Sequence, residues 1–281
     1  MMIIEVSAMD PEAILARKKQ LESQYGPWST PVYLGQGIVT SDEPDKSMGT
    51  RTRKIVQIVK DIARRPLEEL RILDLASLEG QYSLEFADRG AQVVGIEGRE
   101  ANVIKARFAQ EVLELDNVIF HADDVRNLSV EKYGTFDIVL CLGIHYHLDV
   151  PDVFTFLEQV AAVCLDFAVI DTHINLETAE EVEYQGLRYQ GRHVLEHRAG
   201  TSPERRQANI WASLDNPHSF WFNLNSLLQL ASQVGFSSIY ECHIPIWQNM
   251  TKDRIVLLAM KGEREFGFSF REKKELLDPG P

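Results

Sequence analysis

The stretch RILDLASLEGQYSLEFADRGAQVVGIEG, residues 71–98, decides the fold. An apolar run, Ile72 to Leu75, predicts a short strand that carries Asp74, and a turn follows it. A helix is predicted next, and then a second strand over residues 92–96 that ends on an acid, Glu97. This strand–turn–helix–strand order is typical of nucleotide-binding α/β folds. In these folds the ligand lies across the carboxyl ends of parallel strands, and the acid binds a ribose diol.

The turn after the first strand selects among cofactors. A dinucleotide site places glycines where the backbone approaches a pyrophosphate. Here the corresponding positions are Ala76, Leu78 and Gly80, so two of the three carry side chains. A pyrophosphate would be crowded, whereas a cofactor bound through an amino-acid moiety and a ribose is accommodated. The turn therefore disfavours a nicotinamide oxidoreductase.

The same stretch resembles motif I of the class I S-adenosyl-L-methionine (SAM) methyltransferases, in which an acid is followed by three spaced glycines. Asp74 corresponds to the acid, Gly80 to the last glycine and Glu97 to the ribose acid, while Ala76 and Leu78 depart from the pattern. The resemblance implies a Rossmann-like fold, with a mainly parallel seven-stranded sheet and helices on both faces. To this fold the order of the predicted elements adds an inserted lid, described below. The resemblance also implies SAM as the cofactor and S-adenosyl-L-homocysteine (SAH) as its product.

Two further stretches continue this resemblance. FDIVLCLGIHYHLDVP, residues 136–151, is similar to motif IV, and is closest to the branch of tRNA wobble-uridine methyltransferases and their small-molecule relatives. HADDVRNL, residues 121–128, resembles the segment that reads adenine through a carboxylate and a backbone N–H. The cofactor-binding residues that the resemblance implies are Asp74, Ala76, Gly80, Tyr82, Glu97, Gly98, Asp123, Asp124, Val125, Leu142 and Tyr146.

Composition and net charge indicate which partners and which cellular location to expect. No apolar run is long enough to cross a bilayer, and the segment Met1 to Val6 lacks the basic region of a signal peptide, so a cytoplasmic protein is expected. Cys141, Cys164 and Cys242 have no metal-ligand spacing and are expected to be buried, reduced thiols. The net charge of −13 disfavours a nucleic-acid partner, because phosphate contacts require Lys and Arg.

The order of the predicted elements divides the chain into five parts. The helix that usually follows the fifth strand directly is expected only over residues 225–234, so the residues before it are an insertion. The parts are 1–65, N-terminal helices and a loop covering the cofactor site; 66–173, the SAM-binding core; 174–222, an inserted lid or substrate region with a short hairpin or meander over residues 181–197; 223–262, the rest of the core sheet; and 263–281, a tail.

Histidines near the strand ends are the candidate bases. An oxygen nucleophile must lose its proton during methyl transfer, and imidazole is the usual base near neutral pH. His145, Tyr146 and His147 follow the fourth predicted strand, and His173 follows the fifth. We expect the catalytic group to be among these four residues, with the choice of histidine left open. The aromatic residues Trp211, Phe220, Trp221 and Phe222 either wall the acceptor or pack the insertion on the core.

The predicted function is transfer of a methyl group from SAM to a hydroxyl, or a similar group, of a small molecule in specialised metabolism. The alternatives are a tRNA uridine-modifying methyltransferase and a non-catalytic partner protein with the same fold. A divalent cation held by Asp149, Asp152, Asp171 and His173 is a further variant, but no repeated ligand pattern supports it and no metal is predicted. A homodimer is left open.

Overall fold

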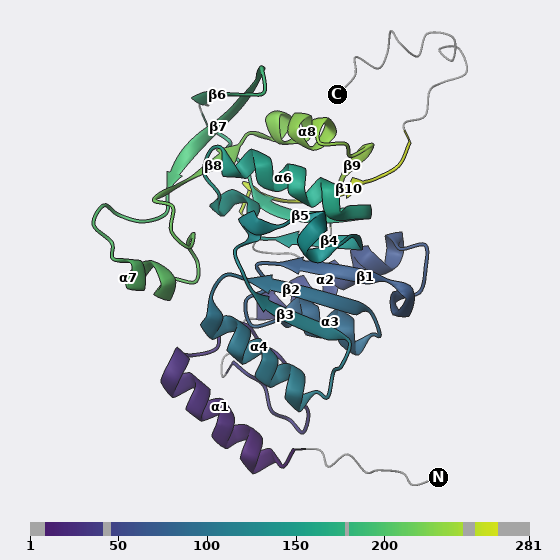
Figure 1. Ribbon diagram of the computed structural model, residues 1–281, viewed down its shortest axis with the longest axis vertical. Helices are drawn as coiled ribbons and strands as arrows, with labels where there is room; N and C mark the ends of the chain where they lie inside the picture. The colour runs from purple at the N-terminus through teal and green to yellow at the C-terminus, as the bar shows by residue number, and fades with distance from the viewer. Residues whose placement is uncertain (1–8, 42–45, 178–179, 244–250, 264–281) are drawn as a thin grey trace. The chain divides into compact units, whose positions relative to one another are not determined.

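The computed structural model describes residues 9–41, 46–177, 180–243 and 251–263. In these residues the main sheet has seven strands in the order β3-β2-β1-β4-β5-β10-β9, with helices beside it, and a second sheet has the order β6-β7-β8 (Figure 1). The pairs β1–β2, β2–β3 and β4–β5 are parallel, and β10 is antiparallel to its neighbours. The predicted fold class is therefore confirmed. The chain divides into two compact units, Met1–Asp123 and Asp124–Pro281.

The first unit contains three strands of the main sheet and the N-terminal helices. Its elements are α1 (Pro11–Tyr25), α2 (Lys46–Ile62), η1 (Leu67–Glu69), β1 (Arg71–Leu75), α3 (Gln81–Asp88), β2 (Gln92–Glu97), α4 (Glu100–Val112) and β3 (Val118–Ala122). Helix α1 begins with Pro11, whose fixed φ suits a first helical position, and it packs along α4 (Figure 1). Strands β1 and β2 are buried at nearly every position, as expected of central parallel strands.

The second unit contains the rest of the main sheet and the inserted region. Its elements are η2 (Val125–Asn127), α5 (Val130–Tyr133), β4 (Phe136–Leu142), η3 (His145–His147), α6 (Asp152–Val163), β5 (Cys164–His173), β6 (Glu180–Tyr184), β7 (Leu187–Leu195), α7 (Pro203–Ala208), β8 (His218–Phe222), α8 (Leu224–Gln233), β9 (Ser238–Glu241) and β10 (Arg254–Met260). Helices α6 and α8 pack side by side (Figure 1). No helix in the described ranges is long and apolar enough to cross a membrane.

The inserted region forms a three-stranded antiparallel sheet, in which the hairpin continues as a meander into β8. Strands β6 and β7 are joined at Gln185 and Gly186, both with left-handed φ angles, as the favoured two-residue hairpin turns require. The additional strand is β8, which pairs with β7 and contributes the fully buried rings of Phe220 and Phe222 to the core. The insertion is thus part of the hydrophobic core of the second unit, and most of the predicted tail, 263–281, lies outside the described residues.

The ring of Phe120 on β3 explains why two positions of the first unit are glycine. A Cβ at Gly95 on β2 would lie 2.7 Å from this ring, and a Cβ at Gly80 would lie at the same distance. Carbon atoms in proteins do not approach so closely. The two glycines therefore allow β2, β3 and the start of α3 to pack around one aromatic side chain.

We expect Gly95→Ala to destabilise the protein by about 1–3 kcal/mol, because the added methyl overpacks the core against Phe120. Urea unfolding of Gly95→Ala, Phe120→Leu and the double variant measures the coupling between the two sites. The cost of Gly95→Ala should be smaller when residue 120 is leucine. An equal cost in both backgrounds would show that the ring is not the cause.

Candidate functional site

The turn between β1 and α3 has left-handed φ angles at all three positions of the glycine motif, although two of them are not glycine. Ala76 and Leu78 have φ angles of 54° and 49°, and Gly80 has 83°. The left-handed region costs residues with a side chain about 1–2 kcal/mol. Ala76 and Leu78 therefore adopt a backbone conformation that favours glycine. Other interactions of the first unit have to offset the strain at these two residues.

Glu97, the predicted ribose acid, stabilises this turn. Its buried carboxylate accepts the backbone N–H groups of Leu78 and Arg99, both at 2.9 Å, and the side-chain amide of Asn102 at 3.3 Å. Burial, the largest cause, raises the pKa of Glu97 in spite of these donors. An ionised carboxylate offers about four acceptor positions, so one remains for a ligand hydroxyl.

Asp74, which corresponds to the first acid of the motif, lies inside the unit. Its Oδ2 accepts the backbone N–H of Ser83 at 3.1 Å and the Ser83 hydroxyl at 2.6 Å. Burial raises its pKa to about 7. Tyr82, which precedes Ser83 at the start of α3, is also buried, and the guanidinium of Arg51 lies 5.9 Å from its ring centroid. Asp74 thus ties the start of α3 to β1.

Glu79 is a second buried carboxylate at this turn, and its role was not predicted from the sequence. It is fully buried, and it accepts the backbone N–H groups and the hydroxyls of Ser29 and Thr30. Lys105 on α4 lies 3.3 Å from the same carboxylate and donates to the carbonyl of Pro27. Glu79 therefore fixes the N-terminal loop, which was predicted to cover the cofactor site, against the turn. A lone acid before a glycine gave no signal for this role.

The predicted adenine segment is divided between the two units. Asp123 ends the first unit, and its N–H donates to the carbonyl of Glu97 at 3.0 Å. Asp124 begins the second unit, where its carboxylate is held by the guanidinium and backbone N–H of Arg126. Val125 is buried beneath this turn. The Asp124 carboxylate is therefore held by Arg126, and the adenine-reading role of Asp123, Asp124 and Val125 stays a prediction.

Two of the candidate histidines in the second unit form pairs with carboxylates. His173 Nδ1 lies 3.0 Å from Asp253, and His147 Nδ1 lies 2.9 Å from the buried Glu196. A histidine that donates through Nδ1 keeps Nε2 free as a base. Burial lowers the pKa of His173 further than its bond to Asp253 raises it. When Nδ1 donates to its carboxylate, each ring can therefore present Nε2 as an acceptor.

His145 has a different environment. It is buried between the rings of Phe156 and Phe222, and its Nε2 lies 3.1 Å from the carbonyl of Val153. Burial lowers its pKa to about 4. This position favours a packing role that fixes η3 on α6, and it leaves His147 and His173 as the better candidate bases.

Tyr146 is at the centre of the aromatic side chains that surround these bases. Its ring centroid lies 4.2 Å from that of His147 and 4.7 Å from that of His173, and Trp221 of β8 stacks on His173 at 4.8 Å. Leu142 ends β4 just before this segment and is buried. The motif residues and a side chain of the insertion therefore meet within one unit.

A cavity of about 820 Å³ opens beside this cluster, within the second unit. It is lined by both apolar and polar residues, namely Ile174, Asn175, Leu176, Glu177, Arg192, His193, Val194, Leu195, His218, Trp221, Lys252 and Asp253. Most of them belong to the inserted region, which was predicted to wall the acceptor. In the described part of the chain, no cluster of three or more His, Cys, Asp or Glu could hold a metal ion. The carboxylates of Asp152 and Asp171 are instead held by Arg126 and Arg254.

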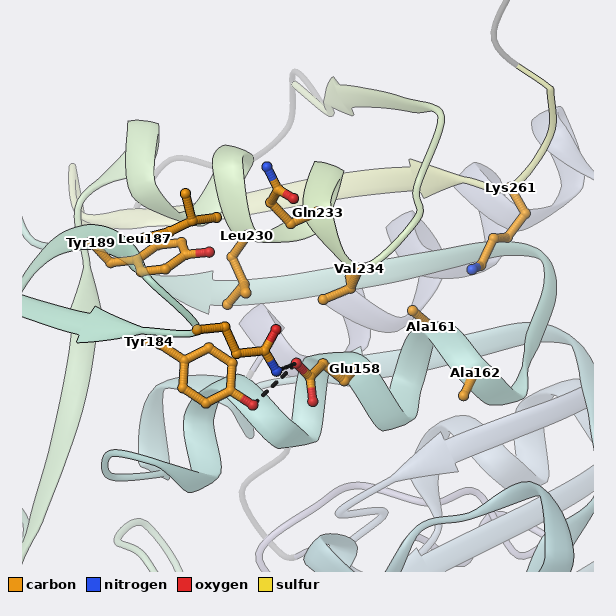
Figure 2. Close-up of a pocket in the computed structure, with 11 residues that line it drawn as sticks. Glu158, Ala161, Ala162, Tyr184, Leu187, Tyr189, Leu230, Gln233, Val234 and Lys261 are labelled. Atoms are coloured by element: carbon orange, nitrogen blue, oxygen red, sulfur yellow. Dashed lines mark hydrogen bonds between the residues drawn. The ribbon is translucent and has the colours of Figure 1, made fainter. Parts of the chain in front are cut away.

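A second hollow shows how the insertion is anchored. Figure 2 shows the side chains of α6, the β6–β7 hairpin and α8 around it, with Tyr184 reaching Glu158 of α6. Glu158 accepts the Tyr184 hydroxyl at 3.1 Å and the Gln185 amide at 2.9 Å, and Tyr184 stacks on Phe154 at 4.4 Å. One end of the hairpin is thus fixed on α6, while the other end of β7 leads to Glu196 and the candidate bases.

Known proteins resemble much of this chain. A family model described as a methyltransferase domain matches residues 72–166. The solved N-terminal domain of EvdMO1, in the presence of SAH and D-fucose, is 27% identical, with a TM-score of 0.69 over 90% of this chain and 98% of that domain. The chain belongs to the class I SAM-dependent methyltransferases. This membership confirms the predicted superfamily and its cofactor, SAM, and it excludes the nicotinamide oxidoreductase. The narrower resemblance to the wobble-uridine branch stays a prediction.

Curated relatives of this methyltransferase match shorter stretches. A ubiquinone biosynthesis O-methyltransferase of Rhodopseudomonas palustris is 36% identical over 100 residues, which are 34% of this chain and 36% of that protein. A 23S rRNA (uracil(1939)-C(5))-methyltransferase of Shewanella halifaxensis is 42% identical over 77 residues, 27% of this chain and 17% of that protein. The matches thus span about a third or less of these relatives, so they do not identify the acceptor.

The turn of this methyltransferase fits a ligand with many polar groups. Besides the open position on Glu97, Ser77 Oγ and Gln81 Oε1 are buried and have no hydrogen-bond partner among the described residues. Buried polar atoms without partners are uncommon in native proteins, and a ligand is one explanation for them. The hydroxyl, amino and carboxylate groups of SAM are of the kind that this turn can bind.

We expect Glu97→Ala to weaken SAM binding at least tenfold, because it removes a charge-assisted hydrogen bond to the ribose, worth on the order of 1.5–3 kcal/mol. Isothermal titration calorimetry measures the affinity. Since Glu97 also holds the amides of Leu78 and Arg99, the folded fraction is checked by circular dichroism. Glu100→Ala, at an exposed acid on α4, is the matched control. Unchanged affinity in a folded Glu97→Ala variant would place the ribose elsewhere.

A raised pKa at Asp74 also predicts the pH dependence of stability. A carboxyl whose pKa is higher in the folded state stabilises the fold below its unfolded pKa near 4, and this contribution is lost as the pH rises through about 7. Asp74→Asn keeps an acceptor for Ser83 but cannot ionise. The variant should therefore not show the loss of stability at higher pH that Asp74 causes, which is roughly 1.4 kcal/mol per unit of pKa shift. Urea unfolding between pH 4.5 and 7.5 measures this difference.

The control for this measurement is Asp116→Asn, at an exposed carboxyl. Glu97, whose pKa burial also raises, should leave part of the pH dependence in place. If the Asp74→Asn and wild-type proteins lose stability equally over this pH range, Asp74 titrates normally and the prediction is wrong.

Proposed function

We propose that this methyltransferase transfers the methyl group of SAM to a hydroxyl of a small molecule, with His173 as the general base. The observation that carries the proposal is the pair His173–Asp253, which lies beside the cavity that Trp221 and Asp253 line. Asp253 accepts Nδ1–H and so holds the tautomer in which Nε2 is free. The inserted region supplies most of the walls around the acceptor.

The chemistry requires only one proton transfer from the protein. When bound, SAM supplies an electrophilic methyl group on a sulfonium. His173 Nε2 takes the proton of the acceptor hydroxyl as the oxygen–methyl bond forms and the carbon–sulfur bond breaks, with its electron pair going to sulfur. The methylated oxygen, SAH and an imidazolium result. Burial, which lowers the pKa of His173, keeps its ring neutral and able to act as a base in slightly acidic solution.

Similar proteins support a small acceptor that carries hydroxyl groups. The EvdMO1 domain was solved with D-fucose, a sugar, present beside SAH, and it matches nearly the whole of this chain. The Rhodopseudomonas relative is an O-methyltransferase. We therefore propose sugars and dihydroxy aromatic compounds as the first acceptors to assay.

A nucleic-acid acceptor is the second candidate, since one relative is a 23S rRNA methyltransferase. Its match spans only 17% of that protein, and the net charge of this chain is −13. A protein that binds RNA through its phosphates needs a cluster of Lys and Arg side chains on its surface. The cavity beside His173 has two acids, Glu177 and Asp253, and two basic residues, Arg192 and Lys252, among its lining residues. It therefore has no excess of positive charge for a phosphate backbone, which favours a small neutral acceptor.

We expect His173→Ala to lower kcat by roughly 10²–10⁴ while SAM affinity barely changes. The rate of the wild-type enzyme should fall on the acid side, at a pH below the ordinary imidazole pKa of about 6.5, because burial lowers this pKa. Steady-state assays with SAM and the acceptors named above measure both effects.

The controls separate the candidate bases. His243→Ala, at an exposed histidine paired with Glu241, should retain full activity. His147→Ala tests the pair with Glu196. If His147→Ala loses as much activity as we expect for His173→Ala, and His173→Ala does not, the role of base moves to His147. If neither loses activity, the proposed hydroxyl methylation is wrong.

A further inference from the structure

Trp221 has a buried polar atom that the fold leaves without a partner. Its indole Nε1 forms no hydrogen bond with any described residue. A buried donor in this state costs about 1–3 kcal/mol. Its neighbours on β8, Phe220 and Phe222, point into the hydrophobic core, and successive side chains of a strand face opposite sides. The indole is therefore on the side of β8 that faces away from that core.

The position of this indole relates it to the candidate base. Its ring stacks on His173, with centroids 4.8 Å apart and an angle of 23° between the planes. Tyr146 contacts it edge-on at 5.7 Å. The ring also lines the 820 Å³ cavity together with Asp253, the carboxylate that orients His173. The indole and the carboxylate that orients the base thus border the same cavity.

We propose that the indole N–H of Trp221 donates a hydrogen bond to a second oxygen of the acceptor, beside the hydroxyl that His173 deprotonates. This proposal rests on the proposed function. The two stacked rings lie 4.8 Å apart, so a small group that carries two oxygens on adjacent carbon atoms is of a size to meet both of them. The enzyme therefore selects vicinal diols, and Trp221 determines this specificity.

The physical reason for selection is the cost of an unpaired donor. A diol satisfies the indole N–H, whereas an acceptor with one hydroxyl leaves it buried and unpaired. The difference should appear as roughly a ten- to hundredfold preference in kcat/KM for the diol, since each factor of ten corresponds to about 1.4 kcal/mol. An aromatic wall without a donor would not make this distinction.

The test combines one substitution with matched acceptors. The acceptor pairs are catechol with phenol, and a methyl pyranoside with its monodeoxy analogue. Trp221→Phe keeps an aromatic ring on His173 but removes the N–H. We expect the diol preference to fall to near unity, mainly through a higher KM for the diol, with the pH profile of kcat unchanged. Trp211→Phe, at an exposed tryptophan of the same inserted region, should keep the full preference.

A binding measurement makes the test independent of turnover. With ¹⁵N-labelled tryptophan, the indole N–H resonance of Trp221, assigned by its loss in Trp221→Phe, should move downfield on addition of a diol with SAH and stay in place with the single-hydroxyl analogue. No shift with either diol, or an unchanged preference in Trp221→Phe, would overturn this role. A shift without methylation of any diol would instead refute the proposed function and leave the contact intact.

Discussion

Two buried carboxylates hold the turn between β1 and α3, on which the first unit of this enzyme depends. Glu97 accepts the amide of Leu78 from one side, and Glu79 binds Ser29, Thr30 and Lys105 on the other. Without them, the left-handed angles at Ala76 and Leu78 would be strained positions in a short loop. The hydrogen bonds to charged groups are strong enough to offset strain of this size. They allow side chains at positions where related turns use glycine.

The same carboxylates connect distant parts of the first unit. Breaking a buried ion pair such as Glu79–Lys105 leaves an uncompensated charge, which costs several kcal/mol, about 3–5 in typical cases. The N-terminal loop is thus tied to the turn by an interaction that is expensive to lose. A loop fixed in this way can form a constant wall of a binding site, whereas a loop held by apolar contacts alone would open more readily.

In the second unit, strand pairing positions the chemistry. Strand β10 runs antiparallel to β5 with Arg254 opposite His173, so Asp253 lies next to the imidazole and Arg254 reaches the buried Asp171. The insertion contributes in the same way, since β7 and β8 bring Glu196 to His147 and Trp221 to His173. Each candidate base is therefore oriented by an acid from a distant part of the sequence. Such support outside the reacting groups fixes the tautomer and the direction of the free nitrogen.

The sequence by itself determined the α/β fold and the class of cofactor, and it predicted the segments that bear the site. Those properties depend on local patterns: the apolar strand before Asp74, the acid at Glu97 and the Tyr-His after β4. Only the tertiary structure decided which side chains meet. Glu79 and Lys105 are 26 residues apart, and His173 and Asp253 are 80 apart. Similarly, the burial that makes His145 a packing residue depends on Phe222 of the insertion. Contacts of this kind follow from strand register and core packing, which join residues far apart in the chain and leave no periodic signal in the sequence.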